Sequence, residues 1–153
     1  MTSARPRRRA RPSRVFVSHA HQDSAIAREI VKWVRARRVK VWFAPAHIET
    51  GAEWYREIGR GLDSCDWFLV LVSRSAARSL WVRREVESAA ITDRFENRII
   101  PILLDSTRPK ALGWSLAAMQ YIDLRGGSMV PLGALAKRWS LPAARKKAGQ
   151  KRA

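Results

Sequence analysis

Short apolar runs alternate along this chain with segments that carry apolar residues on one face only. The run WFLVLV at residues 67–72 is continuous, as in a central strand that is covered on both sides. The other runs are β-rich and bounded by polar residues. The pattern predicts five strands, at residues 14–18, 39–43, 67–72, 98–104 and 120–124.

Helical periodicity fills the intervals between these strands. Behind the first strand, Ile26, Ile30 and Val34 fall on one helical face, and Asp23 stands where a capping residue is expected. The same reasoning predicts three later helices, around residues 54–62, at 79–92 and at 131–139.

Strands separated by helices predict a parallel sheet with helices on both faces, because parallel neighbours need long crossovers. We expect the flavodoxin-like, doubly wound order 2-1-3-4-5, which is common at this size. Pro101 is awkward within a central strand, so we expect it at a strand end or a sheet edge. The loops after the first three strands, at residues 18–22, 44–51 and 73–78, then share the rim where such sheets bind ligands.

Composition agrees with one folded domain. The chain has 153 residues, of which 46% are hydrophobic, and this is enough to bury a core. Its single cysteine, Cys65, excludes an intrachain disulfide framework and fits a reducing compartment, so we expect a cytoplasmic protein. No apolar run approaches the roughly 18 residues of a membrane helix.

The formal net charge of +17 is concentrated at the two ends. Residues 1–14 contain six arginines and residues 143–153 contain five basic residues, with no acid in either segment. We therefore expect basic disordered tails at 1–13 and 141–153 around a domain at 14–140. Such tails are able to contact nucleic acid weakly through its phosphates, but the body shows no recognition pattern for it.

Several familiar kinds of site are missing from the predicted rim. The first turn has no glycine for a dinucleotide, and no phosphate-binding Gly-Lys-Ser/Thr loop or Gly-x-Ser-x-Gly element occurs. Ser73 stands where a phospho-acceptor domain would need Asp. His19 and His21 lack an evident third ligand, for which only His47 or Asp23 is near, so we predict no metal site.

Trp81 and Glu85 remain, and their i, i+4 spacing stacks them on one helical face just beyond the third strand. Taken by themselves these two residues leave two interpretations open. Glu85 is either a solvated acid beside a Trp that covers the core, or a carboxylate in a ligand cleft.

Three motifs in order resemble the Toll/interleukin-1 receptor (TIR) domain family, in its bacterial branch. They are RVFVSHAHQD at 14–23, VWFAP with IETG at 41–51, and VLVS with SLWVRRE at 70–85. The resemblance covers about residues 14–125. It implies a flavodoxin-like sheet and a mobile loop from Ala44 to Gly51.

For enzymatically active members, the resemblance also implies cleavage of NAD⁺ to nicotinamide and ADP-ribose or a cyclic isomer, with NAD⁺ as substrate and no separate cofactor. Glu85 corresponds to the catalytic Glu of the family's Trp-x-x-x-Glu element. The residues expected to line the same cleft are His21, Gln22, Thr50, Ser73 and Trp81. This chain departs from the family pattern after the second strand, because it has Phe43-Ala44-Pro45 where many relatives have an acid.

Two other functions stay open. The domain is alternatively a non-catalytic scaffold that assembles through TIR–TIR contacts of the 44–51 loop, although scaffold members commonly lack the Glu. The basic tails alternatively make it a nucleic-acid-associated protein. A role in bacterial antiphage defence would follow from family analogy alone.

Overall fold

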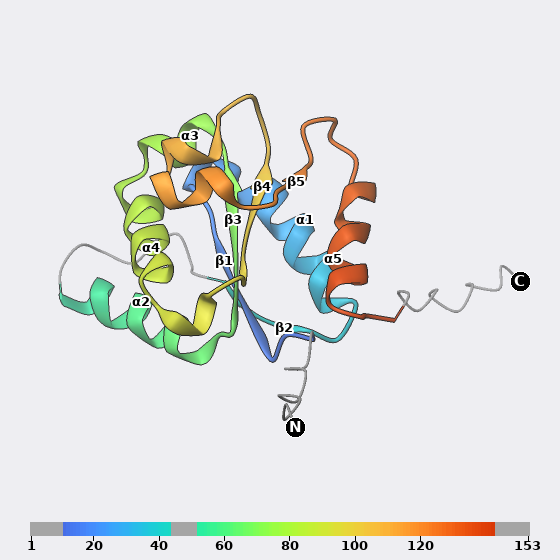
Figure 1. The fold of residues 1–153 in the computed structure, drawn as a ribbon, viewed down its shortest axis with the longest axis horizontal. Helices are drawn as coiled ribbons and strands as arrows, with labels where there is room; N and C mark the ends of the chain where they lie inside the picture. Colours follow the sequence, from blue (N-terminus) through green and yellow to red (C-terminus); the bar gives the residue numbers. More distant parts are fainter. Residues whose placement is uncertain (1–10, 44–51, 143–153) are drawn as a thin grey trace, which may run out of the picture.

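The computed structural model describes residues 11–43 and 52–142, except for the side chains of residues 52–54. Its single sheet is parallel throughout and has the strand order β2-β1-β3-β4-β5, so the predicted flavodoxin-like topology is confirmed (Figure 1). The strands are β1 (Arg14–Ser18), β2 (Lys40–Phe43), β3 (Trp67–Val72), β4 (Ile99–Leu103) and β5 (Ile122–Asp123).

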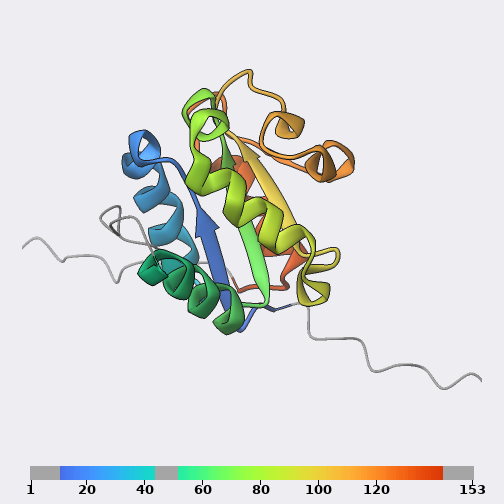
Figure 2. The ribbon, with the colours of Figure 1, turned by 90° about the vertical axis from the view of Figure 1, so that its left-hand side faces the viewer.

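Helices cover both faces of the sheet. Figure 1 views the sheet nearly on edge, with α2 and α4 on one side and α1 and α5 on the other. Figure 2 shows α2 and α4 lying across the face that is turned toward the viewer. The α-helices are α1 (Ser24–Arg35), α2 (Ala52–Ser64), α3 (Arg74–Arg78), α4 (Leu80–Ala90) and α5 (Gly133–Arg138). Short 3₁₀ turns, among them η1 (His21–Asp23), complete the connections.

The central strand β3 joins the two halves of the core. All six of its residues are buried, and they alternate between the layers as the two-residue period of a strand requires. Phe68 and Val70 pack in the cluster under α2 and α4, whereas Leu69 and Leu71 pack in the cluster under α1 and α5. The prediction of a strand covered on both faces is therefore confirmed.

Pro101 lies inside β4, and β4 lies between β3 and β5, so the prediction of an end or an edge is wrong. The register explains how the sheet accepts it. The Leu104 N–H donates a hydrogen bond to the Val72 carbonyl oxygen of β3. Backbone nitrogens alternate in direction along a strand, so the nitrogen of Pro101, three residues earlier, faces the β5 side. Pairing with β5 begins only at Ile102, so no strand stands opposite the missing N–H.

Other elements differ from the sequence prediction in extent. Residues 74–78 form α3 instead of a loop, because the Ser73 hydroxyl accepts a hydrogen bond from the Ala76 N–H and caps a helical turn. Asp23 occupies the N-cap position of α1, but its side chain makes no capping hydrogen bond. The predicted strand at 120–124 pairs only at Ile122 and Asp123. Within the described residues, no helix has the length and apolar character needed to span a membrane.

The predicted domain limits at residues 14 and 140 stay predictions. The predicted tails at 1–13 and 141–153 fall almost entirely outside the described part of the chain.

Two glycines of α2 give a matched pair of stability tests. A Cβ on Gly61 would lie 2.6 Å from Cε2 of Trp42 and 2.8 Å from a ring carbon of Phe16, whereas a Cβ on Gly59 would meet nothing within 4 Å. The Trp42 and Phe16 rings are stacked 4.6 Å apart, which leaves them little freedom to move. We therefore expect Gly61→Ala to lower the free energy of unfolding by about 1–3 kcal/mol.

Gly59→Ala should instead raise it by up to about 1 kcal/mol, because alanine is the better helix former. Urea denaturation of both variants is the measurement. Equal shifts of the same sign would contradict the described contact between α2 and the rings.

Candidate active site

Buried polar side chains gather at one end of the sheet. Within the described residues, the buried polar or charged residues are Ser18, His19, Ser73 and Glu85. Ser18 ends β1, and Ser73 directly follows β3. Polar groups are seldom left buried without a structural or chemical reason, so this rim is the candidate site.

Glu85 reaches the interior because of where α4 begins. The Ser79 hydroxyl accepts a hydrogen bond from the Val82 N–H at 3.2 Å and fixes the first turn. With that start, the helical period turns Val82, Glu85 and Val86 toward the sheet, where α4 contacts β1 and β3. Glu85 is 1% exposed. It is therefore not a solvated surface acid, which was one of the two interpretations that the sequence left open.

Burial raises the pKa of the Glu85 carboxyl well above its ordinary value of 4.5. The Ser18 hydroxyl and the Trp81 indole lie nearby and lower the pKa in part. Even so, within the described residues neither carboxyl oxygen has a partner at the distance and angle of a full hydrogen bond, and the Ser18 hydroxyl has none either. The site thus holds an acid that favours its protonated form, and no cationic side chain in the described part of the chain offsets its burial.

Trp81 lies one turn before Glu85 on α4. Its side chain is half-buried and packs against the apolar cluster that contains Val82 and Val86. The predicted shared face of Trp81 and Glu85 is therefore present. An indole in this position separates the carboxyl group from part of the solvent.

A hydrogen bond between Ser73 and Asp23 connects the end of β3 to the segment that follows β1. The Ser73 hydroxyl donates to Oδ2 of Asp23 at 2.5 Å and accepts from the Ala76 N–H at 3.0 Å. A short O–H···O⁻ hydrogen bond of this kind is among the stronger ones in proteins. On the other side of α3, Oδ2 of Asp105 accepts from the Arg74 N–H at 2.9 Å. Ser73 thus positions α3 and η1, and Asp23 is used here instead of as a cap.

The first-loop residues divide between the interior and the surface. His19 is buried and stacks on Phe43, with ring centroids 4.7 Å apart, and desolvation lowers the pKa of its imidazole. His21 and Gln22 are exposed in η1, at the same end of the sheet as Ser73, but no described contact joins them to Glu85. Thr50 lies outside the described residues.

The histidines also bear on the metal question. Within residues 11–43 and 52–142, no three His, Cys, Asp or Glu side chains come together as a possible metal site. His47, which was considered as a third ligand, is outside those ranges. Cys65 is buried, and desolvation raises the pKa of its thiol to about 11, so the neutral thiol predominates at neutral pH.

Two features of the rim were not identified from the sequence. Ser18 was placed at the end of the first strand and in the rim loop but not named as a site residue, although its two-residue spacing from buried Phe16 places it on the α4 face of β1. The Ser73–Asp23 hydrogen bond joins residues 50 positions apart, and nothing in the local pattern points to it.

The fold and the rim define an open α/β domain with a buried carboxyl group at the ligand-binding end of its sheet. The TIR domain family matches residues 15–136, and the chain belongs to that family.

Curated relatives match this chain at low identity. A probable 2′ cyclic ADP-D-ribose synthase from Methanobrevibacter olleyae, TcpO, is 26% identical over 94 residues, which are 61% of this chain and 28% of the relative. The 2′ cyclic ADP-D-ribose synthase BtTIR from Bacteroides thetaiotaomicron is 24% identical over 65% of this chain and 36% of its own length. The NAD(+) hydrolase PdTIR from Paracoccus denitrificans is 27% identical over 61% of this chain and 32% of its own length. The chain thus spans about a third of each relative.

Solved structures share the fold. The TIR domain of the Toll-related receptor TRR-2 from Hydra magnipapillata superposes with a TM-score of 0.62 at 16% identity, covering 77% of this chain and 89% of that one. A metazoan TIR-STING receptor from C. gigas, solved with 2′,3′-cGAMP, has a TM-score of 0.66 at 19% identity, covering 92% of this chain and 43% of that one. At these identities the likeness concerns the fold alone.

The raised pKa of Glu85 predicts a pH-dependent loss of stability. Because the folded-state pKa lies above the unfolded one, the folded chain binds more protons between the two values. Protonated Glu85 therefore makes its full contribution to the free energy of unfolding at pH values below the ordinary Glu pKa. That contribution is lost as the pH rises through the folded-state pKa. Glu85→Gln removes the charge and should raise the melting temperature at pH 8 by several degrees, since each kcal/mol shifts it by about 2–4 °C at this size.

Thermal melts at pH 5 and pH 8 provide the measurement. The gain in the Glu85→Gln variant should be larger at pH 8 than at pH 5. The exposed Glu87, on the same helix, is the control, and Glu87→Gln should show no such trend. A gain that does not change with pH would mean that Glu85 titrates normally.

Proposed function

We propose that this TIR domain cleaves the bond between nicotinamide and ribose in NAD⁺, with Glu85 as the catalytic residue. The observation that carries the proposal is a buried carboxyl group beside Trp81 and Ser18 on the rim, with no compensating charge among residues 11–43 and 52–142. A carboxyl group in such a position lowers the stability of the fold. A catalytic role would explain why the chain retains it.

The reaction needs an anion more than it needs an acid. When the bond from N1 of nicotinamide to C1′ of the ribose breaks, its electron pair moves to the pyridinium ring, which leaves as a neutral molecule. Positive charge then develops on the ribose as an oxocarbenium ion, as in glycoside hydrolysis. An ionised Glu85 close to the sugar would stabilise this charge more in the transition state than in the ground state.

The second half of the reaction consumes a nucleophile at C1′. A water molecule adds its oxygen to C1′ and gives up a proton, so that the products are nicotinamide, ADP-ribose and H⁺. A hydroxyl or ring nitrogen of the same nucleotide would add instead in a cyclisation. The names of the relatives include both a hydrolase and synthases of a cyclic ADP-ribose, and they support NAD⁺ cleavage without selecting a product.

Substrate binding would itself shift Glu85 toward its ionised form. In the free protein, burial favours the protonated carboxyl group. A cationic nicotinamide ring beside it favours the ionised form and draws the pKa down. The ionised form of Glu85 would then be more populated with the substrate bound than in the free protein at the same pH. Trp81 would line the nicotinamide end of the cleft and keep water away, which strengthens the interaction between the two charges.

The other residues expected to line the cleft belong to the same proposal. Ser73, held by Asp23, would fix the rim under the nucleotide, with His21 and Gln22 at its exposed side. Thr50 and the loop at 44–51, outside the described residues, would supply further contacts and the surface for TIR–TIR assembly. A place in bacterial antiphage defence is part of this proposal by family analogy only.

Nicotinamide release from NAD⁺ tests the catalytic proposal. Purified chain at high concentration should release nicotinamide, and Glu85→Gln should lower the rate by at least about 100-fold, as expected for loss of a main transition-state charge. Glu87→Gln, on the exposed face of α4, should keep the rate within about twofold. Undiminished turnover in Glu85→Gln would refute the site. No turnover in any form, including assembled protein, would favour the scaffold function.

The pH profile gives a second test. If only ionised Glu85 is active, kcat/KM should fall with decreasing pH through the pKa of the free protein, which lies well above 4.5. The fall in kcat should lie at lower pH, because bound NAD⁺ lowers that pKa. A profile that is flat down to the ordinary Glu range would contradict the role of burial.

A further inference from the structure

Basic side chains line a groove along the free edge of β2, at the margin of the sheet opposite β5. Two adjoining hollows make it up, with volumes of about 450 and 550 Å³, and both are lined by Arg35. Together these hollows are here called the β2-edge groove. The basic residues that line it are Arg14, Arg28, Lys32, Arg35, Arg38 and Lys40. Among the described residues that line the two hollows, none is acidic.

The helical half of the groove follows from the sequence of α1. Arg28, Lys32 and Arg35 recur at i, i+4 and i+7 on one exposed stripe of the helix. At about 1.5 Å per residue, the stripe extends for about 10 Å. Glu29, the one acid in α1, falls about 100° away around the helix and is not part of the lining.

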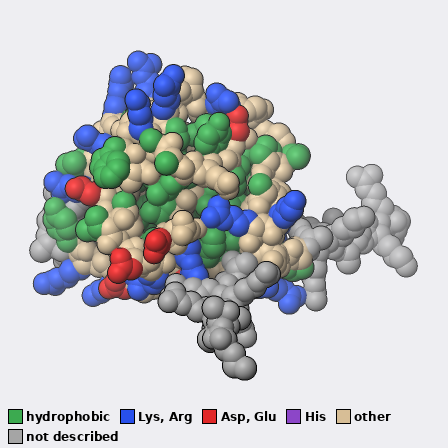
Figure 3. All heavy atoms as spheres, in the orientation of Figure 1, with side chains coloured by type: hydrophobic (Ala, Val, Ile, Leu, Met, Phe, Trp, Pro, Cys, Tyr) green, Lys and Arg blue, Asp and Glu red, His purple; other side chains and the backbone are tan. Residues whose placement is uncertain are grey.

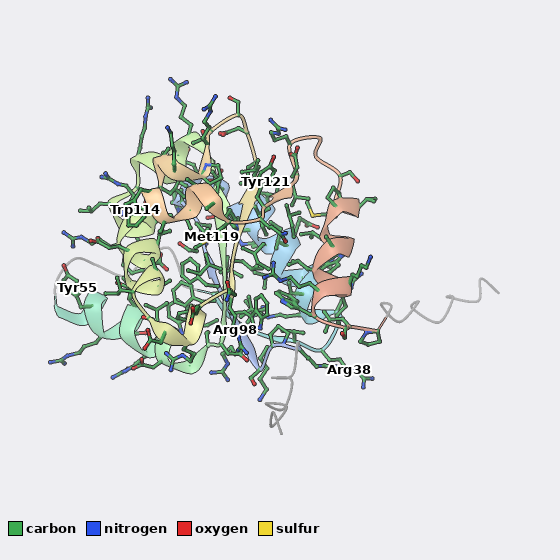
Figure 4. All side chains as sticks on the ribbon, in the orientation of Figure 1. Arg38, Tyr55, Arg98, Trp114, Met119 and Tyr121 are labelled. Atoms are coloured by element: carbon green, nitrogen blue, oxygen red, sulfur yellow. The ribbon has the colours of Figure 1, made fainter. Side chains whose placement is uncertain are left out.

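The other half begins where α1 ends. Arg38 has a left-handed backbone, with φ of 61°, and turns the chain into β2. Figure 4 shows its side chain extending outward at the lower margin of the molecule. Arg11 donates to the backbone carbonyl of Arg38 at 3.0 Å and so ties the start of the described chain to this turn.

Within the described residues, none of the six groove residues forms a side-chain ion pair. The ion pairs found there use Glu57, Asp63, Asp66 and Asp123, and none of them involves a groove residue. Asp66, whose carboxylate accepts from the Arg14 backbone N–H, pairs with the Arg98 side chain at 3.7 Å. Six like charges along one edge repel one another, and an extended polyanion would relieve that repulsion.

The surroundings of the groove favour a nucleic-acid backbone over a membrane. A membrane-binding surface combines basic residues with exposed apolar side chains that insert between lipids. The exposed large apolar side chains of the described chain are elsewhere, and Figure 4 shows Tyr55, Trp114 and Tyr121 well away from Arg38. Other basic side chains are spread over the periphery of the face in Figure 3, but the groove combines charge with a hollow.

We propose that the β2-edge groove binds the phosphate backbone of nucleic acid. The aromatic residues at the groove, Trp42 and Phe43, are occupied by stacking on Phe16 and His19. Bases would thus find no free stacking partner there, and binding should depend on phosphates rather than on sequence. The proposal does not depend on NAD⁺ cleavage.

Fluorescence anisotropy with a labelled 25-base-pair DNA duplex and the full chain tests it. The groove variant is Arg28→Gln/Arg35→Gln/Lys40→Gln. The control variant, Arg83→Gln/Arg108→Gln/Lys110→Gln, removes the same charge from exposed residues away from the groove. We expect the groove variant to weaken binding at least tenfold at 100 mM salt and to reduce the salt slope by about 2–3, since each phosphate contact contributes about 0.9. The control should weaken binding by less than threefold.

The other outcomes would overturn the proposal. Equal losses in the two variants would show that only net charge matters. No loss in the groove variant would assign the binding to the tails. Binding to vesicles containing phosphatidylserine, but not to the duplex, would indicate a membrane surface. Duplexes of unrelated sequence should bind alike, and thermal melts of both variants verify that they are folded.

Discussion

Burying a carboxyl group without a full hydrogen-bond partner costs free energy, and α4 imposes that cost on this domain at Glu85. The apolar neighbours of Glu85 on α4 are those that any amphipathic helix would place against the sheet. A leucine side chain at this position would pack in the core without the cost of burying a carboxyl group. The fold tolerates the acid because β3, covered on both faces, supplies a large apolar core around it. Among the described residues, this buried acid is the observation on which the proposed catalytic role of Glu85 rests.

The elements around Glu85 are fixed by polar contacts at the strand ends. Ser73 links β3, α3 and η1 through one hydroxyl, which donates to Asp23 and caps α3 at the same time. Ser79 then restarts the helix at an orientation that turns Glu85 inward. Two serines six residues apart therefore set the angle at which the carboxyl group approaches β1. The charged β2-edge groove is on another margin of the sheet. The residues that form it are therefore different from those that position Glu85.

The sequence predicted the topology because each strand and helix carries its own hydrophobic period, and the parallel order follows from the crossovers. It also singled out Glu85 with Trp81, since an i, i+4 pair on a helix is a local pattern. Pro101 was misjudged because the pairing of a nitrogen depends on the register with β5, which a strand pattern does not contain. The Asp23–Ser73 bond and the groove both join distant residues, and only the folded chain brings them together.

The most direct test of this account is the ionisation of Glu85 itself. Carboxyl-¹³C glutamate labelling, with Glu85→Gln to assign the signal, would follow its titration by NMR in the free protein and with NAD⁺ added. The account predicts a midpoint well above 4.5 in the free protein and a lower midpoint when NAD⁺ is bound. A normal midpoint without NAD⁺, or one that NAD⁺ leaves unchanged, would contradict it.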